Sequence, residues 1–254
     1  MQDIFSPLLA DEYPIVSFLT TEEAIKASSF VLVVGGDGTI LHVSAFAARY
    51  HKPVLGINLG TIGFLSELDL RDIEMLRRVK SGGYQLDERI LIDVCVKNSM
   101  EEITFYATGL NDAAIMKGDI SKIIKLLIYV NGRKVMGFSG DGAVVCTPTG
   151  STAYSLSAGG PILEPSSFCI AVTPVCPHSL AIKSFVVSAD REIEIALPPQ
   201  NNSVQLSVDG YQNKKLEPDE RIIVKKSEKT LSLIRLKGIV FYERINQKLS
   251  NERL

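Results

Sequence analysis

A run of four apolar residues followed directly by a glycine turn is the feature that most constrains this chain. Residues 31–34 are Val-Leu-Val-Val, and the sequence Gly-Gly-Asp-Gly-Thr follows at residues 35–39. A short, mostly β-branched run of this kind predicts a parallel strand that is buried on both faces. Apolar residues then recur at helical spacing up to Tyr50, namely Ile40, Val43 and Ala47. The stretch therefore predicts a strand, a tight turn and a helix, the unit from which α/β domains are built.

The composition of this turn suits an anion. Gly35, Gly36 and Gly38 have no Cβ, so a bulky anion can approach the backbone amides at the positive end of the helix. Asp37 would repel a phosphate, which favours a role in accepting a proton or in holding a metal. The alternative is that Asp37 only caps the helix, since Asp is a favoured N-cap residue. The turn is neither a P-loop nor a dinucleotide fingerprint, because both require other residues or another glycine spacing.

Composition excludes several classes of protein. With 254 residues the chain can form one large domain or two modest ones. Its 27 basic and 29 acidic residues nearly cancel, so no nucleic-acid partner is expected. The apolar runs fall short of the roughly 18 residues that span a membrane, and no secretory signal is evident, so we expect a cytoplasmic protein without a membrane partner. The four cysteines, at positions 95, 146, 169 and 176, have neither the spacing of a zinc site nor that of a disulfide framework. We expect them to be reduced and mostly buried thiols.

The first third of the chain predicts alternating strands and helices. Residues 15–19 are a candidate strand, and Thr20 and Glu23 form a capping box for a helix through Ala27. Residues 53–58 predict the next parallel strand, and residues 69–80 predict a helix. This order indicates half of a doubly wound α/β domain, with ligands at the carboxyl ends of the strands.

After Gly83 the hydrophobic period changes from 3.6 to 2, which predicts strands. Asn131-Gly132 predicts a hairpin between 124–130 and 134–138. Further strands are expected at 90–97, 103–107, 143–147, 168–173, 184–188, 192–197, 203–208, 221–225 and 231–235. We therefore expect an α/β domain over 1–86, joined by a tail at about 239–254 that holds a short strand and a helix, and a β-rich domain over 87–238.

A second motif occupies residues 148–161, Pro-Thr-Gly-Ser-Thr-Ala-Tyr-Ser-Leu-Ser-Ala-Gly-Gly-Pro. Its hydroxyl groups, glycines and single aromatic ring are the mixture that a planar, polar ligand such as a nucleotide requires. The alternative is a polar loop with a helix cap at Ser151 or Thr152.

Together the motifs resemble one family. Gly-Gly-Asp-Gly-Thr resembles a signature shared by NAD kinases, by lipid kinases of the diacylglycerol and sphingosine type, and by phosphofructokinases. The motif at 148–161 resembles the second signature of NAD kinases alone. Asn111-Asp112 and Asp209-Gly210 resemble two further acidic positions of that family. The resemblance implies a Rossmann-like α/β domain followed by a β-rich, β-sandwich-like domain.

The resemblance also implies roles for particular residues. Asp37 would be the catalytic base, and Asp141 would reach the NAD of a neighbouring subunit. The other residues implied to bind NAD are Gly38, Phe64, Asn111, Asp112, Thr152, Ala153, Tyr154, Ser155, Leu156, Ser157 and Asp209. The phosphates of ATP would lie against Gly35, Gly36, Gly38 and Thr39. Three alternatives stay open, since Asn111-Asp112 can simply begin a turn, Asp209-Gly210 is a hairpin dipeptide, and Phe64 can be a core aromatic.

The implied activity is transfer of the γ-phosphate of ATP, or of another donor, to the 2′-hydroxyl of the adenosine ribose of NAD. Mg²⁺ or Mn²⁺ on the triphosphate is expected, with no protein ligand for the metal assigned, and the implied assembly is a homodimer or homotetramer. The alternatives are a lipid or sugar kinase, against which the second motif argues, and a non-catalytic nucleotide sensor, which would not need Asp37. Ser139, Tyr211 and His42 depart from the usual pattern of the family.

Overall fold

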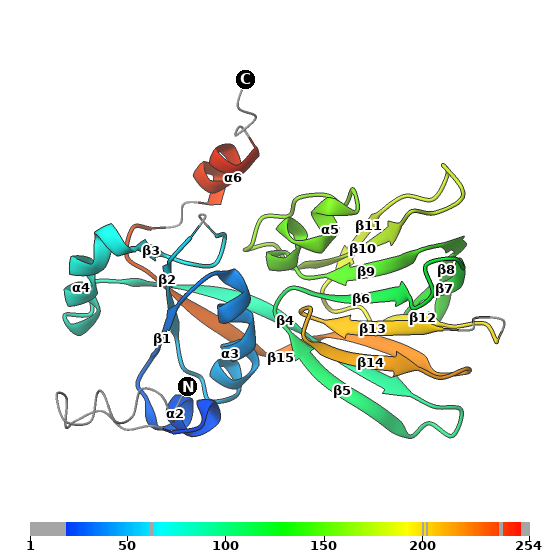
Figure 1. Ribbon diagram of the computed structural model, residues 1–254, viewed down its shortest axis with the longest axis horizontal. Helices are drawn as coiled ribbons and strands as arrows, with labels where there is room; N and C mark the ends of the chain where they lie inside the picture. Colours follow the sequence, from blue (N-terminus) through cyan, green and yellow to red (C-terminus); the bar gives the residue numbers. More distant parts are fainter. Residues whose placement is uncertain (1–18, 61–62, 200, 202, 239–240, 250–254) are drawn as a thin grey trace.

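The computed structural model describes residues 19–60, 63–199, 201, 203–238 and 241–249 (Figure 1). The strand expected at 15–19 lies almost wholly outside these residues, as does the short strand expected at the start of the tail.

The first part of the chain is an α/β unit. The helix α2 (Thr21–Ala27) begins with the predicted capping box of Thr20 and Glu23. The strands β1 (Val31–Val34), β2 (Val54–Asn58) and β3 (Leu68–Asp69) are parallel to one another. The helix α3 (Asp37–Arg49) buries Ile40 and Ala47 against one face of the sheet. The 3₁₀ helix η1 (Leu70–Leu76) and α4 (Arg77–Lys80) cover the other face, so β2 is buried along its whole length.

Two expectations for this unit are wrong in detail. β1 is not buried on both faces, since Leu32 and Val34 are 43% and 51% exposed. The reason is position, because β1 is the edge strand of its sheet within the described residues. Most of the helix expected at 69–80 is 3₁₀ rather than α.

Two long strands join this unit to the rest of the molecule. The strands β4 (Gln85–Lys97) and β15 (Arg221–Arg235) are antiparallel neighbours, and β15 also pairs in parallel with β2. Figure 1 shows both strands running from the α/β unit into the β-rich part. The strands expected separately at 221–225 and 231–235 are therefore one strand, with a shift of register between Lys226 and Thr230.

The β-rich part is a sandwich of two sheets. The first sheet has the order β1-β2-β15-β12-β7-β8, with β3 paired to β2, β4 paired to β15 and β5 paired to β4. The second sheet has the order β11-β10-β9-β6-β13-β14. Alternate residues of the two sheets face each other and form the main core, for example Ile92, Leu126 and Ile195 against Ile115, Val145 and Leu206. This alternation is the period of two that the sequence contains.

The remaining elements have these bounds: β5 (Ile103–Gly109), β6 (Asp112–Lys117), β7 (Ile124–Val130), β8 (Arg133–Gly140), β9 (Gly142–Cys146), η2 (Thr149–Thr152), α5 (Tyr154–Ser157), β10 (Cys169–Val175), β11 (Phe185–Ser188), β12 (Ile193–Ala196), β13 (Val204–Val208), β14 (Gln212–Leu216) and α6 (Phe241–Leu249). The hairpin at Asn131-Gly132 is confirmed, with φ of 48° and 73° at its two central residues. Of these strands, β6 and β14 were not expected as separate elements.

The four cysteines are free thiols, but they are not mostly buried, because only Cys146 is fully buried while Cys176 is exposed. Within the described residues, no helix is both long and apolar enough to cross a membrane.

Candidate active site

The carboxylate of Asp37 is held by a neighbouring loop. Asp37 is the first residue of α3, and its Oδ2 accepts a hydrogen bond from the N–H of Phe64 at 2.7 Å. Its Oδ1 accepts bonds from the N–H groups of Leu65 and Ser66, at 3.1 and 3.4 Å. The N-cap residue of α3 is Gly36, with no side-chain hydrogen bond to the helix. The reading of Asp37 as a helix cap is therefore wrong, since its side chain binds the loop between β2 and β3.

This loop approaches Asp37 so closely that one position must be glycine. A Cβ at Gly63 would lie 1.9 Å from Oδ1 of Asp37. By contrast, a Cβ at Gly36 or Gly38 would meet nothing within 4 Å. The turn around Asp37 thus offers open space beside the first amides of α3, as an incoming phosphate requires. Thr39 belongs to this exposed first turn as well, and its side chain packs on Gly35.

A pocket of about 420 Å³ opens one helical turn beyond Asp37. Leu41 brings α3 to the pocket, because positions four apart lie on one face of a helix. Asn111 and Asp112 come from the start of β6, Ala153 and Tyr154 from the second motif, and Asp209 from the turn between β13 and β14. The structure therefore brings together residues that lie up to 169 positions apart in the sequence, from 41 to 210.

The carboxylate of Asp209 organises the backbone of this pocket. Its oxygens accept hydrogen bonds from the N–H groups of Leu110, Asn111 and Asp112, at 2.7, 2.7 and 3.1 Å. Asp209 and Gly210 both have positive φ, so they form the hairpin turn that the dipeptide predicted. Asp209 is thus both a turn residue and a buried anchor for Asn111 and Asp112.

Asn111 has an unused acceptor. Its Oδ1 atom is buried and has no hydrogen-bond partner among the described residues. A buried acceptor without a donor is costly, and a ligand hydroxyl or amide in the pocket would supply that donor. Gly150 of the second motif packs on the backbone of Asn111, where a Cβ would lie 2.0 Å from the carbonyl oxygen.

Two buried carboxylates therefore lie side by side. Burial and the nearby charge of Asp209 raise the pKa of Asp112 to about 7. Burial also raises the pKa of Asp209, but its three N–H donors oppose that shift. Asp112 is consequently the member of the pair that takes up a proton near neutral pH, and it then becomes a hydrogen-bond donor toward the pocket.

The second motif contributes fewer residues than expected. Ala153 and Tyr154 line the pocket. Tyr154 is 40% exposed as a residue, and its hydroxyl lies 3.6 Å from the sulfur of Met116. Ser155 points inward and shares a hydrogen bond of 2.9 Å with Thr173, so its assignment as a ligand-binding side chain is not supported. Thr152, Leu156 and Ser157 do not line the pocket of this chain.

The alternative of a helix cap at Ser151 or Thr152 is wrong as well. The hydroxyl of Ser151 accepts a bond from the N–H of Leu163 and donates to the carbonyl of Pro148, which ties the two ends of the loop together. Thr152 donates to the carbonyl of Thr149.

Asp141 and Phe64 lie outside the pocket. Asp141 forms an ion pair with Lys117 at 2.7 Å, and its side chain is partly exposed. Phe64 is half-buried, and Nζ of Lys248 in α6 lies 4.5 Å from the centre of its ring.

Sequence reasoning missed several residues of the site. Leu41, Ala114, Met116 and Ser207 line the pocket without belonging to any motif. His42 and Tyr211, two positions that depart from the family pattern, pack ring to ring at 4.3 Å beside it. Tyr211 also donates to the carbonyl of Leu41 at 3.3 Å. Among the described residues, no group of three His, Cys, Asp or Glu side chains is arranged to hold a metal ion.

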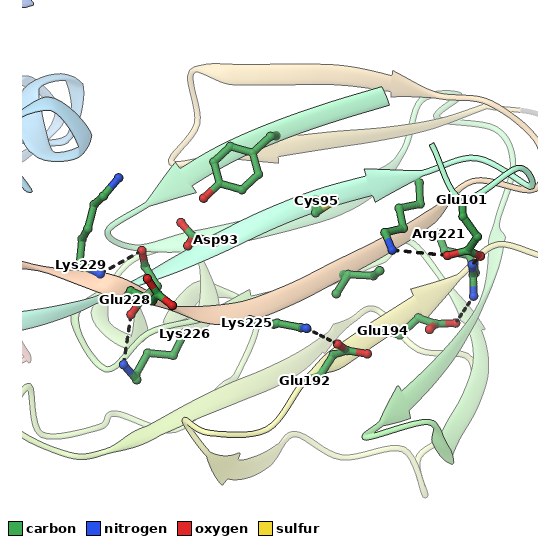
Figure 2. Close-up of a pocket in the computed structure, with 14 residues that line it drawn as sticks. Asp93, Cys95, Glu101, Glu192, Glu194, Arg221, Lys225, Lys226, Glu228 and Lys229 are labelled. Atoms are coloured by element: carbon green, nitrogen blue, oxygen red, sulfur yellow. Dashed lines mark hydrogen bonds and ion pairs between the residues drawn. The ribbon is translucent and has the colours of Figure 1, made fainter. Parts of the chain in front are cut away.

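A larger hollow of about 630 Å³ lies elsewhere, on the outer face of β4, β12 and β15 (Figure 2). Figure 2 shows that its charged side chains turn toward one another, with Lys225 on Glu192 at 2.6 Å and Arg221 on Glu194 at 3.8 Å. These groups neutralise each other within one chain. The pocket beside α3, with its unpaired acceptor, is the better candidate for a ligand site.

Comparison with known proteins gives a consistent picture. Residues 8–84 match the ATP-NAD kinase N-terminal domain, and residues 110–236 match the ATP-NAD kinase C-terminal domain. The chain is 40% identical over 243 residues to the NAD kinase of Carboxydothermus hydrogenoformans, covering 95% of this chain and 86% of that protein. It is 41% identical over 222 residues to the NAD kinase of Symbiobacterium thermophilum, covering 87% and 78%.

Two solved structures are similar. Yeast NADH kinase in complex with NADH matches with a TM-score of 0.85 and 27% identity, over 93% of this chain and 71% of that one. An NAD kinase from Archaeoglobus fulgidus in complex with ATP matches with a TM-score of 0.72 and 26% identity, over 98% and 95%.

Proposed function

The chain belongs to the NAD kinase family, and from this premise we propose that Asp37 is the general base of its phosphoryl transfer. The enzyme transfers the γ-phosphate of ATP to the 2′-hydroxyl of the adenosine ribose of NAD. Asp37 would take the hydroxyl proton as the new oxygen–phosphorus bond forms and the bond to ADP breaks, which leaves NADP and ADP.

One observation carries this proposal. Asp37 is the acidic residue that lies both at the open amino end of α3 and one turn from the pocket beside Asn111, which is the position that a base between two substrates needs. Its three N–H partners fix the carboxylate without neutralising it, because backbone amides carry no net charge. The same position is wrong for binding phosphate directly, since like charges repel.

We propose that NAD occupies the pocket. The unpaired Oδ1 of Asn111 would accept from a ribose hydroxyl, and Asp112 would bind beside it on the nicotinamide side. Tyr154 would stack on the adenine, and Ala153 would lie against the same group. Gly38 and Phe64 would complete the site at the loop that holds Asp37.

The phosphates of ATP would lie at the first turn of α3, against Gly35, Gly36, Gly38 and Thr39. The triphosphate is expected to arrive with Mg²⁺ or Mn²⁺, which would neutralise charge on the transferring group. The protein's own part in this step is positioning, through the open glycine turn at the amino end of α3.

We also propose that the protein is a homodimer or homotetramer with a shared NAD site. Asp141 does not line the pocket of its own chain, and it is partly exposed beside Lys117, which supports a role toward a neighbouring subunit. Thr152, Leu156 and Ser157 could serve that same shared site. Light scattering at assay concentration tests this proposal, and a fully active monomer would contradict it.

We also propose that the two domains contribute different parts of the site. Residues 1–86 and about 239–254 would supply the catalytic loop, and residues 87–238 would supply most of the NAD site. The separate matches at 8–84 and 110–236 support this boundary.

The test of Asp37 is its replacement by Asn. Asn keeps the size of the side chain and one acceptor oxygen for the loop, but it cannot take the proton. We expect kcat of Asp37→Asn to fall roughly 10²- to 10⁴-fold, while NAD still binds. The measurement is kcat together with NAD affinity by calorimetry, with the product identified as the 2′-phosphate by mass and position.

A series of Mg²⁺ concentrations separates the alternatives. Recovery of turnover at high Mg²⁺ would make Asp37 a metal ligand rather than a base. Turnover near that of the wild type would remove Asp37 from the role of general base.

A further inference from the structure

A buried cluster of charges lies on the far side of the loop that holds Asp37. It contains Glu67 in that loop's continuation, Asp87 and Arg89 on β4, Arg235 at the end of β15, and Arg244 on α6. Each of these residues is less than a tenth exposed. None belongs to either sequence motif, and the pocket that we assign to NAD does not include them. Burying five charges is expensive, so the cluster requires an explanation.

The arginines bind the same peptide groups as Asp37, from the opposite side. Nη1 of Arg244 donates to the carbonyls of Gly63 and Phe64, at 3.2 and 3.0 Å. Nη1 of Arg235 donates to the carbonyl of Leu65 at 3.1 Å. The N–H groups of Phe64 and Leu65 in turn donate to Asp37. The loop is thus held by arginines on its carbonyl side and by the proposed base on its amide side.

Glu67 fixes both arginines in place. Its Oε2 lies 3.3 Å from Nη1 of Arg235 and 3.8 Å from Nη2 of Arg244. Its Oε1 accepts from the N–H groups of Leu236 and Lys237, which ties the end of β15 to the loop. Figure 1 shows α6 beside the connection between β2 and β3, and the contact of Lys248 with the ring of Phe64 adds a second link from the same helix.

The cluster also extends to the NAD side. Asp87 binds Arg235 at 2.9 Å and Arg89 at 2.6 Å, and Arg89 donates to the hydroxyl of Thr149 at 3.2 Å. Thr149 begins the motif whose Gly150 packs on Asn111. The three arginines outnumber Glu67 and Asp87, and the charges balance when Asp37 is included as the third carboxylate.

We propose that Arg244 and Arg235 are positioning residues for Asp37, acting through the loop of residues 63–66. The proposal rests on Asp37 being the base. The two arginines orient the peptide groups of residues 63–66 so that their N–H groups point to the carboxylate of Asp37, and they thereby hold that carboxylate in place. In this proposal the helix α6 contributes to the active site, because it carries Arg244.

Arg244→Ala is the first test. We expect kcat to fall about 10²-fold, because a small displacement of a reacting group has an effect of this order. KM for NAD and ATP should change less than about 3-fold, since Arg244 does not line the pocket assigned to NAD and bonds only to the backbone of Phe64 in that site. Guanidinium ion added at millimolar concentration should restore part of kcat in this variant, whereas an equal concentration of sodium chloride should not.

Arg78→Ala is the matched control. Like Arg244, Arg78 donates to a backbone carbonyl, in this case that of Leu236 at 2.8 Å. Unlike Arg244, it does not bind the carbonyls of residues 63–66. Its kcat should stay near that of the wild type. Hydrogen exchange gives a second readout, in which the amides of 64–66 should exchange faster in Arg244→Ala while those of β7 stay protected.

Several outcomes would overturn the proposal. A folded Arg244→Ala enzyme with kcat within about 3-fold of the wild type would do so, as would a loss of kcat that guanidinium does not restore. If Arg244→Ala fails to fold, Arg244→Gln replaces it, because Gln can donate to a carbonyl without a charge, and unfolding of both would assign Arg244 to stability alone. Activity in Asp37→Asn would instead defeat the proposed base, so the two failures are distinguishable.

Discussion

Gly63 lies directly against the carboxylate of Asp37, so closely that a methyl group on its Cα would be 1.9 Å from Oδ1. The contact joins two segments that are 26 residues apart, from 37 to 63. It brings the turn after β1 against the loop after β2. Carboxyl ends of neighbouring parallel strands meet at one edge of a sheet, which is why the two loops can form a single site.

Gly63→Ala should therefore disable catalysis through geometry alone. The added methyl group must push Asp37 or the loop aside, and we expect kcat to fall about 10²-fold or more. NAD affinity should change less, because the pocket is one helical turn away. Steady-state kinetics with calorimetric NAD binding measures both quantities.

Gly60→Ala is the control for this substitution. It lies in the same connection, but a Cβ there would meet no atom of the described residues within 4 Å. Its kcat should match that of the wild type. Equal activity in the two alanine variants would show that the contact between Gly63 and Asp37 does not constrain the reaction.

Asp209→Asn should damage NAD binding rather than chemistry. Asn offers one acceptor oxygen where the carboxylate serves three N–H groups, so the backbone at Leu110, Asn111 and Asp112 loses its anchor. We expect KM for NAD to rise about 10-fold and the free energy of unfolding to fall on the order of 3 kcal/mol. Kinetics and chemical denaturation measure the two effects.

Asp219→Asn is the matched control. Asp219 also has a positive φ in a turn, but it is exposed and does not line the pocket. An Asp209→Asn enzyme with unchanged stability and unchanged KM would mean that the carboxylate is not an anchor.

The sequence predicted the backbone of the site better than the directions of its side chains. The glycine turn, the helix after it and the hairpin at Asp209-Gly210 follow from local rules on glycine, capping and turn conformation. The inward direction of the Ser155 side chain could not be predicted, because Ser155 lies in a helix of four residues, too short for spacing to tell which side is buried. β1 was expected to be buried because residues 31–34 are apolar, but its place at the edge of the sheet formed by the described residues depends on tertiary structure rather than on local sequence.

The arginine cluster could not be predicted from local patterns. Glu67, Arg235 and Arg244 come from three elements that meet only after β15 has paired with β2 and α6 has packed beside β3. A buried charge looks the same in sequence as an exposed one, and charged residues are exposed by default. Only the tertiary structure brings them to the back of the loop that holds Asp37.

Tyr154→Ala should weaken NAD binding more than use of ATP. Tyr154 lines the pocket at its exposed rim, and loss of an aromatic stacking surface costs about 1–3 kcal/mol per base. We expect KM for NAD to rise several-fold while KM for ATP stays unchanged. Tyr106→Ala is the control, because Tyr106 is an exposed tyrosine that lines the other hollow. A change confined to the KM for ATP would assign the ring to the other substrate.

Asp112 should make the stability of the ligand-free enzyme depend on pH. Burial and the charge of Asp209 raise its pKa from 3.8 to about 7, so the folded protein holds a proton that the unfolded chain releases. This contribution to stability is fully present below the lower pKa and is lost as the pH rises through the higher one. Above neutral pH, wild-type protein must keep two buried carboxylates ionised side by side.

Asp112→Asn removes that penalty while it keeps the shape of the side chain. The Tm of this variant relative to the wild type should therefore rise between about pH 5 and pH 8, by an amount that corresponds to a few kcal/mol at most. Asp190→Asn, at an exposed position, should show no such trend. The comparison isolates one group, because every other titrating residue is common to both proteins. A constant difference in Tm across this range would mean that the pKa of Asp112 does not lie within it, and would contradict the prediction.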